Sequence, residues 1–254
     1  DIDVIITTTA TPDTIFPSLG CRIQDGLGTT TIPAFDLVGA CSGFLYGMIV
    51  AEGMILGGVA KRILLIASET LSRITNYKDR NTCVLFGDGS GAFVLEESFD
   101  ESGMLSYYWK SDGSLAELLS QPGGGTRIPT RRENVDLDLQ YLHMKGNEVF
   151  KHAVKKMGEA AVEAVQRAGL EKKDIDFLFP HQANIRIIEA TGRRLDLPEE
   201  KVFINIHKYG NMSCATIPIG VHEMLKDGRL KPGHHIVLVA FGAGFTWASV
   251  AYRI

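Results

Sequence analysis

Three segments of the chain carry side chains that could together support nucleophilic catalysis. Residues 39–44 place the thiol of Cys41 between the end of an apolar strand and the start of an apolar helix. At a helix N-terminus the unpaired backbone N–H groups and the helix dipole favour a negative sulfur, so we expect a lowered thiol pKa. A cysteine in this setting could act as a reactive nucleophile.

The other two segments each follow a predicted strand and precede a predicted helix. His181 comes directly after an apolar stretch, and Asn211 lies just before the helix that begins near Cys214. Proteins of the α/β class gather catalytic groups at the carboxyl ends of their strands. Taken singly, Cys41 could be a small buried residue, His181 a loop histidine and Asn211 a helix cap. Only their combination points to catalysis.

Composition narrows the class of function. The formal net charge of -4 gives no global basic field, so nucleic-acid binding is not expected. No apolar run approaches the roughly 20 residues that a membrane-spanning helix needs. The remaining cysteines, Cys21, Cys83 and Cys214, form no CxxC pair, which argues against a zinc site and a disulfide framework. We therefore expect no metal, no other cofactor and a cytoplasmic location.

Two glycine-rich stretches invite comparison with nucleotide-binding loops. Residues 87–91 and 242–244 do not complete a GxGxxG motif ahead of a helix, and each precedes a predicted strand. We therefore interpret both stretches as turns.

Apolar runs punctuated by Gly and Pro predict alternating strands and helices. Predicted strands cover residues 4–8, 34–38, 63–67, 82–86, 92–96, 104–110, 177–179, 202–205, 235–241 and 246–252. Predicted helices cover residues 18–27, 43–56, 146–168, 185–195 and 214–227. This alternation favours an α/β fold in which helices cover parallel-rich sheets.

The two halves of the chain look like copies of one unit. The strand that begins at Asp3 matches the one that begins at Asp176, and Ile63 matches Ile236, both at an offset of 173 residues. We therefore expect an N-terminal half at residues 1–100, which carries the cysteine. A C-terminal half at residues 101–254 carries the histidine and the asparagine.

The second copy opens with a strand and a long helix that have no counterpart in the first copy. By the same offset, these counterparts would start roughly 70 residues before Asp1, and we interpret the chain as lacking them. The first strand of a doubly wound unit is usually central. We therefore expect an open apolar slot within one sheet.

Five segments occur in an order that resembles β-ketoacyl-acyl-carrier-protein synthase III, a family of the thiolase-like superfamily. They are residues 39–44, 79–89, 180–184, 209–213 and 241–247. The resemblance implies a five-layered αβαβα sandwich built from a duplicated unit, whose first half here lacks its initial strand and helices. It also implies the condensing enzyme that initiates type II fatty-acid synthesis.

The resemblance assigns a role to each chemical group. Cys41 would take an acyl group from acyl-CoA, and the backbone N–H groups of Cys41 and Ala243 would form the oxyanion hole. Malonyl-acyl-carrier protein would then lose carbon dioxide, with His181 and Asn211 stabilising the enolate. For this role His181 should be neutral with its Nε2 protonated. Phe241 would wall the acyl pocket.

The same resemblance implies partner surfaces. Coenzyme A would be bound by Arg80 and Asn147, and Phe16 would reach into the acyl pocket of a second subunit in a homodimer. An acidic carrier protein would dock on a basic patch, for which an ordinary solvated face is the alternative. Its members would be Lys151, Arg186, Arg193 and Arg194, of which Arg186 and Arg193 share a helix face because they are seven residues apart.

Two alternatives remain open at this stage. A related condensing enzyme of the polyketide or hydroxymethylglutaryl-CoA synthase kind can also use Cys, His and Asn. An inactive acyl-binding paralogue would keep the fold without the reaction. The basic patch and residues 242–247 favour the fatty-acid initiator over the first alternative, and the intact Cys41, His181 and Asn211 argue against the second.

Overall fold

The computed structural model describes all 254 residues and contains two four-stranded sheets. The first sheet has the order β2-β1-β3-β4, made of β1 (Val4–Thr8), β2 (Ala34–Leu37), β3 (Arg62–Thr70) and β4 (Asp88–Glu96). The second has the order β5-β10-β9-β8, made of β5 (Gly103–Ser111), β8 (Phe177–Pro180), β9 (His235–Gly242) and β10 (Thr246–Arg253). The short strands β6 (Leu119–Ser120) and β7 (His143–Met144) pair separately.

Both sheets are mixed rather than largely parallel. Strand β1 is parallel to β2 and β3, and β8 is parallel to β9. The pairs of β3 with β4, β9 with β10, and β10 with β5 are antiparallel. The predicted βα alternation therefore holds along the chain, but each half ends in a strand that reverses direction.

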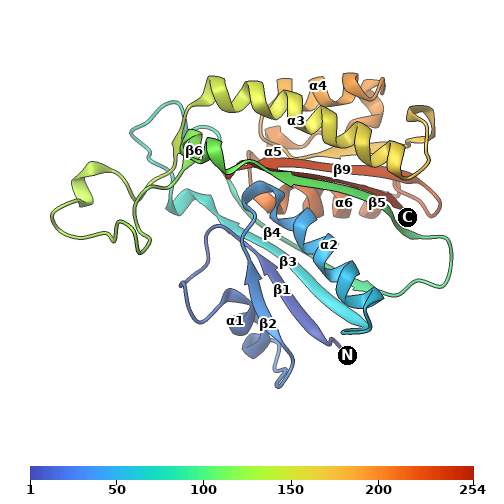
Figure 1. The fold of residues 1–254 in the computed structure, drawn as a ribbon, viewed down its shortest axis with the longest axis horizontal. Coiled ribbons are helices and arrows are strands. Elements are labelled where there is room, and N and C mark those ends of the chain that lie inside the picture. The colour runs from blue at the N-terminus through green and yellow to red at the C-terminus, as the bar shows by residue number, and fades with distance from the viewer.

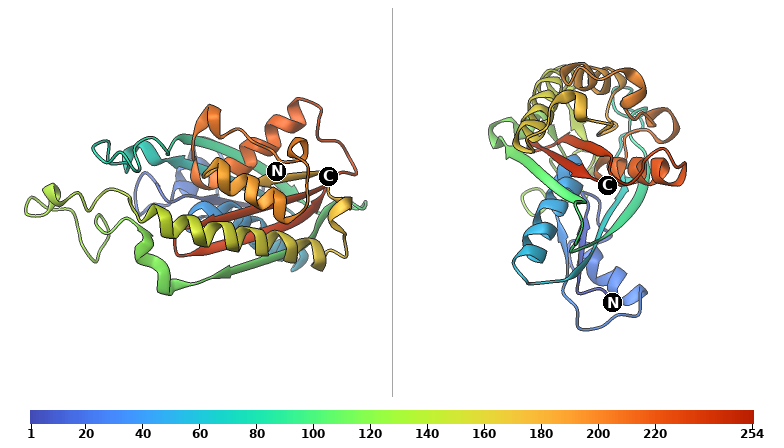
Figure 2. Two further views of the ribbon diagram at one scale, coloured as in Figure 1. Left: turned by 90° about the horizontal axis from the view of Figure 1, so that it is seen from above. Right: turned by 90° about the vertical axis from the view of Figure 1, so that its right-hand side faces the viewer.

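The sheets stack in layers with helices (Figure 1). Helices α2 (Gly43–Leu56) and α6 (Thr216–Lys226) lie between the two sheets, and α3 (Gly146–Arg167) and α4 (Ile185–Arg194) cover the second sheet. Helix α1 (Leu19–Gly26) packs on β1 and β2, and the short α5 (Ile206–Tyr209) leads toward α6. Figure 2 shows the segment between β6 and β7 extending away from these layers. No helix combines the length and the apolarity required to cross a membrane.

Strand pairing follows the predicted repeat. Val4 pairs with Ile63, and 173 positions later in both strands Phe177 pairs with Ile236. One hydrophobic cluster of 25 buried residues takes members from both halves, among them Phe44. The halves therefore fold against a shared core, even though each contributes its own sheet.

Two short strands were predicted wrongly. Residues 82–85 form turns, because Thr82 N and Cys83 N donate to Asp79 O at 3.2 and 3.0 Å, and Phe86 contributes only a single bridge, to Asn211. Residues 202–205 contribute only a single bridge, between Leu178 and Val202. Local turn hydrogen bonds outweighed the apolar pattern in the first case.

The predicted turn at residues 87–91 is also wrong, because Asp88 to Gly91 belong to β4 and pair with β3. These glycines serve close packing instead. A Cβ atom on Gly89 would lie 2.4 Å from Met212 Sδ, and one on Gly91 would lie 3.0 Å from Pro218 Cβ. The small residues let β4 approach the segment that leads into α6.

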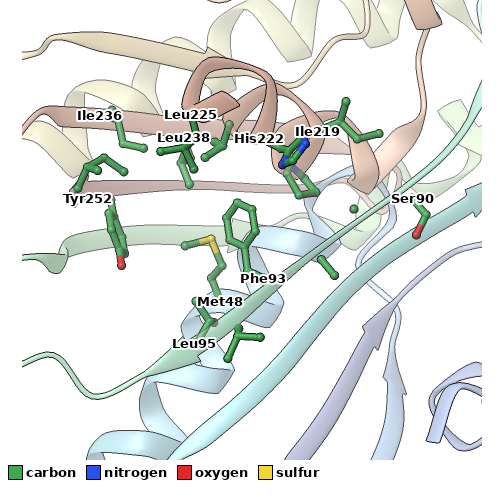
Figure 3. Close-up of a pocket in the computed structure, with 16 residues that line it drawn as sticks. Met48, Ser90, Phe93, Leu95, Ile219, His222, Leu225, Ile236, Leu238 and Tyr252 are labelled. Carbon is green, nitrogen blue, oxygen red and sulfur yellow. The ribbon is translucent and has the colours of Figure 1, made fainter. Parts of the chain in front are cut away.

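The first strand of the second copy is not central. Strand β5 lies at the edge of its sheet beside β10, where Trp109 packs edge-on against Tyr46 of α2 with ring centroids 5.1 Å apart. The matching edge, that of β4, has no such neighbour. A groove of about 600 Å³ lies there instead, lined by Phe93 and Leu95 of β4, by Ile219 and His222 of α6, and by residues of β9 and β10 (Figure 3). The groove therefore lies at the edge of a sheet rather than within one, in the position that corresponds to that of β5 beside β10.

Candidate active site

Cys41, His181 and Asn211 line one cavity of about 600 Å³. The sequence analysis singled out these three residues from separate segments, and the fold brings them together at the carboxyl ends of β2 and β8 and ahead of α6. Further residues of this cavity were not predicted. They are mostly apolar, among them Leu85, Phe86, Val149, Phe150 and Met157.

The Cys41 elbow is held by the β9–β10 hairpin of the other half. After β2 the chain turns at Ala40, whose φ of 46° is unusual for a residue with a side chain, into a short 3-10 helix. The Ser42 hydroxyl donates to Thr246 O at 3.1 Å, and the Thr246 hydroxyl donates to Gly39 O at 3.0 Å. Strain at Ala40 is thus compensated by contacts that fix the sulfur in place.

The backbone at Gly242 also lies very close to the backbone of Cys41. A Cβ atom on Gly242 would lie only 2.6 Å from the backbone nitrogen of Cys41, so no other residue fits there without moving the elbow. Ala243 follows directly, in the turn between β9 and β10. The two segments that carry the predicted oxyanion donors therefore lie against each other.

The expected lowering of the Cys41 pKa is wrong. Burial raises the pKa of this thiol to about 12, and the negative charge of Glu69 adds to the rise, although hydrogen bonding by Ser213 opposes it. Desolvation disfavours the thiolate more than the neighbouring backbone N–H groups favour it. The free sulfur is therefore held as a neutral thiol and needs a proton acceptor when it reacts.

His181 is held neutral at the end of β8. Its backbone nitrogen donates to Val239 O at 2.7 Å, and its side chain is 1% exposed. Burial lowers the imidazole pKa to about 3. Nδ1 lies 2.8 Å from the Thr216 hydroxyl, which donates to Ser213 O at 3.0 Å and then accepts from Nδ1; only when the hydroxyl turns to donate to Nδ1 does the ring proton reside on Nε2.

The side chain of Gln182, the next residue after His181, holds the loop that follows β8 through hydrogen bonds. Gln182 is fully buried, and its Nε2 donates to Pro180 O at 2.8 Å and to Phe203 O at 3.1 Å. Its Oε1 accepts from Asn205 N at 2.9 Å. This amide thus ties β8 to the segment that leads toward Asn211, a role that its sequence position alone did not reveal.

Asn211 is positioned by the 79–89 segment. Asn211 N donates to Leu85 O at 2.8 Å, and Gly87 N donates to Asn211 O at 2.9 Å. The side-chain oxygen of Asn211 accepts from Ser213 N at 2.8 Å, which leaves the Nδ2 group as the free donor. A Cβ atom on Gly87 would lie 2.1 Å from Tyr209 O, so glycine is required at this crossing.

Phe241 and Asn147 also line the cavity, the first buried on β9 and the second exposed at the start of α3. Arg80 is exposed on the loop next to Asn81, which is a lining residue. Phe16 lies outside the cavity, on the loop between β1 and α1, where its side chain is 84% exposed. The structure therefore places Arg80 beside the cavity and Phe16 away from it.

Among the predicted basic residues, Arg186 is the one that lines the cavity. Its guanidinium carbon lies 5.1 Å from the centre of the Phe150 ring. Lys151 is paired with Glu148 at 3.0 Å and Arg193 with Glu189 at 3.8 Å, so part of their charge is compensated. Arg194 is exposed and lays its aliphatic stem against Gly158 of α3. No group of three or more His, Cys, Asp or Glu side chains is arranged to hold a metal ion.

Known proteins resemble this chain in sequence and in structure. The family model for 3-oxoacyl-[acyl-carrier-protein] synthase III matches residues 35–113, and the model for its C-terminal part matches residues 165–254. The β-ketoacyl-[acyl-carrier-protein] synthase III of Roseiflexus sp. is 48% identical over 252 residues, which are 99% of this chain and 77% of that protein. The one from Caldanaerobacter subterraneus is 49% identical over 249 residues, which are 98% of this chain and 75% of that protein.

Solved structures of this family also resemble this chain. The crystal structure of 3-oxoacyl-[acyl-carrier-protein] synthase III from Aquifex aeolicus matches with a TM-score of 0.91 and 43% identity, over 100% of this chain and 77% of that one. The chain thus spans about three quarters of the length of each of these relatives.

The lowered pKa of His181 predicts a specific loss of stability in acid. Below its ordinary pKa of 6.5 the unfolded chain binds a proton at this residue, whereas the folded chain does not until about pH 3. His181 therefore favours folding above pH 6.5, and this contribution is lost as the pH falls toward 3, by up to about 1.4 kcal/mol per pH unit. Urea unfolding of the wild type and His181→Asn from about pH 7 to about pH 4 should show a shallower decline for the variant. Equal slopes would contradict a buried neutral imidazole.

Proposed function

Because the chain belongs to the 3-oxoacyl-[acyl-carrier-protein] synthase III family, we propose that it condenses an acyl-CoA primer with malonyl-acyl-carrier protein. The product would be a 3-oxoacyl-acyl-carrier protein, the first intermediate of type II fatty-acid synthesis. The observation that carries this proposal is the convergence of Cys41, a neutral His181 and the free amide of Asn211 on one cavity. The fold is the thiolase-like one of this family, and we regard its layers as a duplicated unit.

In the first half-reaction the sulfur of Cys41 attacks the thioester carbonyl of acyl-CoA, and coenzyme A leaves as a thiolate. The negative charge that develops on the carbonyl oxygen requires fixed donors, which the backbone N–H groups of Cys41 and Ala243 would supply. The close approach of Gly242 to Cys41 N supports this assignment, because it places both segments beside the sulfur.

In the second half-reaction the malonyl thioester loses carbon dioxide, and its enolate carbon attacks the acyl group on Cys41. Two neutral donors can stabilise the enolate oxygen, His181 through Nε2–H and Asn211 through Nδ2–H. A cationic imidazole would instead hold the carboxylate that must leave. The low pKa of His181 thus suits this step better than an ordinary histidine would.

The walls of the cavity fit an acyl chain and a thioester arm. Phe241, Phe150 and Met157 supply apolar surface, which keeps water from the enolate. Asn147 and Arg186 stand at the exposed margin of the same cavity, where polar parts of a phosphopantetheine arm would pass. Arg80, exposed nearby, would stack on the adenine of coenzyme A.

We further propose that an acidic carrier protein docks beside Arg186, with Lys151, Arg193 and Arg194 around it. Arg186 is the central member because it borders the cavity and no carboxylate is paired with it. A homodimer would cover the exposed loop that carries Ile15 and Phe16, which are 75% and 84% exposed. Phe16 would then limit the primer length in the partner subunit's pocket.

The first test is acyl transfer to the protein itself. Incubation with acetyl-CoA should add one acetyl group to Cys41, detected by mass spectrometry of the intact protein and its peptides, because this is the sole cysteine in the cavity. Cys41→Ala should take up none, with Cys21, Cys83 and Cys214 as internal controls. An adduct that persists in the variant would refute the assignment, and a wild type without any adduct would indicate an inactive acyl-binding protein.

The second test separates the two half-reactions. His181→Ala and Asn211→Ala should each slow decarboxylation of malonyl-acyl-carrier protein by about 10²- to 10³-fold, the cost of losing one oxyanion donor. Acetyl transfer to Cys41 should stay within a few-fold of the wild type. If both half-reactions fall equally, the assigned roles are wrong.

The third test concerns carrier-protein docking. Arg186→Glu should raise the KM for malonyl-acyl-carrier protein about tenfold at low salt while leaving acetyl-CoA loading unchanged, and the effect should shrink as salt screens the charge. Arg229→Glu makes the same charge change near Phe177, where β8 begins, at the far end of that strand from His181. This control should behave as the wild type. Equal losses with both substrates would instead indicate a folding defect.

A further inference from the structure

A carboxyl group outside the cavity holds the short helix that precedes Asn211. Glu223 belongs to α6, does not line the cavity, and has a side chain that is 18% exposed. Its Oε1 accepts from the Tyr209 hydroxyl at 2.7 Å, and its Oε2 accepts from Asn205 Nδ2 at 3.3 Å. Lys208 Nζ lies 3.5 Å from Oε1. One carboxylate thus contacts residues at both ends of α5.

These contacts involve a charged acceptor. Burial raises the pKa of Glu223, but hydrogen bonds from Tyr209 and Asn205 and the charge of Lys208 outweigh burial, so the net pKa is lowered. Hydrogen bonds to a carboxylate are roughly twice as strong as those between neutral groups. Asn205 is 1% exposed and its Oδ1 has no partner, so its side chain depends on Glu223 alone for hydrogen bonding. Loss of the carboxylate would leave this buried amide unsatisfied.

The start of the same helix has a second anchor, on the side of His181. Gln182 Oε1 accepts from Asn205 N at 2.9 Å and from Ile206 N at 3.1 Å. These bonds fix the backbone where α5 begins. The end of α5, which is nearer to Asn211, is held instead through the Tyr209 side chain by α6.

A movement of Tyr209 would be passed on to Asn211. Only Gly210 lies between them, with a φ of 69°, and its N–H donates to Ile206 O at 2.8 Å. Tyr209 O lies so close to Gly87 that a Cβ atom on this glycine would be 2.1 Å away. Gly87 N in turn donates to Asn211 O at 2.9 Å. The backbone of Asn211, and with it the direction of Nδ2, therefore depends on where Tyr209 is held.

The groups of the first half-reaction are held by other contacts. The Cys41 elbow is fixed to the β9–β10 hairpin by the hydrogen bonds of Ser42 and Thr246. Glu223 forms no hydrogen bond or ion pair with either segment, because its carboxylate is occupied by residues 205–209. A change at Glu223 should therefore affect the donor side of the cavity and leave the sulfur in place.

We propose that Glu223 is a positioning residue for malonyl decarboxylation, which through Tyr209 keeps the side-chain amide of Asn211 directed at the enolate oxygen. This inference rests on the proposed function, because it concerns one donor of that same half-reaction. Glu223 touches neither the substrate nor the reacting atoms. Its effect on the reaction passes entirely through Asn211.

The experiment compares the half-reactions in Glu223→Gln and Tyr209→Phe. Glu223→Gln should lower kcat for decarboxylation of malonyl-acyl-carrier protein by about 10- to 100-fold, the cost of a misplaced group, with KM and acetyl loading of Cys41 within about twofold of the wild type. Tyr209→Phe removes only the hydroxyl and should lower kcat in the same way, to a smaller extent. Asp227→Asn is the matched control, because it removes a carboxylate paired with Arg229 at 3.2 Å just after the same helix, and it should behave as the wild type.

A double-mutant cycle shows whether the effect passes through Asn211. Once Asn211→Ala has removed the donor, adding Glu223→Gln should slow decarboxylation no further than about twofold, because nothing remains to be positioned. A general structural defect would instead add its full cost in both backgrounds. An undiminished effect of Glu223→Gln in the Asn211→Ala background would overturn the proposal, as would full decarboxylation by Glu223→Gln itself.

Hydrogen exchange of the peptide that covers residues 206–213 gives a readout independent of activity. Gly210 N and Asn211 N donate to Ile206 O and Leu85 O, so their exchange reports opening of this segment. Exchange should be faster in Glu223→Gln and unchanged in Asp227→Asn. Wild-type exchange in Glu223→Gln would contradict the proposal. If the wild type does not decarboxylate malonyl-acyl-carrier protein, the proposed function fails, while the exchange rates still decide whether Glu223 holds the segment that carries Asn211.

Discussion

The contact between the Cys41 elbow and the β9–β10 hairpin is the constraint on which the site depends. Two hydrogen bonds, from Ser42 to Thr246 O and from Thr246 to Gly39 O, join segments that are about 200 residues apart. Each contributes only about 1 kcal/mol, so their importance is geometric. Strand β9 also holds His181 through Val239, and the same strand therefore fixes both the sulfur and the imidazole.

Neutral groups dominate the interior of the site. Burial keeps the thiol of Cys41 protonated and the imidazole of His181 unprotonated, and no Asp or Glu lines the cavity that they share. In such surroundings a fixed donor stabilises a developing negative charge strongly, because water does not compete for it. The buried Glu69 is the exception among these groups, and burial raises the pKa of its carboxyl group.

Residues with a strong local pattern were predicted well. The long amphipathic run of α3 and the apolar run of α2 matched their helices within a residue, because each pattern spans several turns. Segments of four or five residues gave a mixed outcome: residues 4–8 form β1, whereas residues 82–86 form no strand, since a few local hydrogen bonds can outweigh so short a pattern. The direction of the Cys41 pKa was also wrong, because the helix-terminus effect is local whereas desolvation depends on everything packed around the sulfur.

The sequence by itself determined the repeat of 173 residues, the strand-to-helix positions of Cys41, His181 and Asn211, and the family that these motifs resemble. Only the tertiary structure decided that β5 lies at a sheet edge, that Leu85 and Gly87 hold Asn211, and that the Cys41 elbow packs against the β9–β10 hairpin. The physical reason is the distance along the chain over which each kind of interaction acts. Periodicity and motif spacing are properties of neighbouring residues, whereas hydrogen bonds and desolvation at a site depend on segments that meet only after the two halves have packed on their shared core.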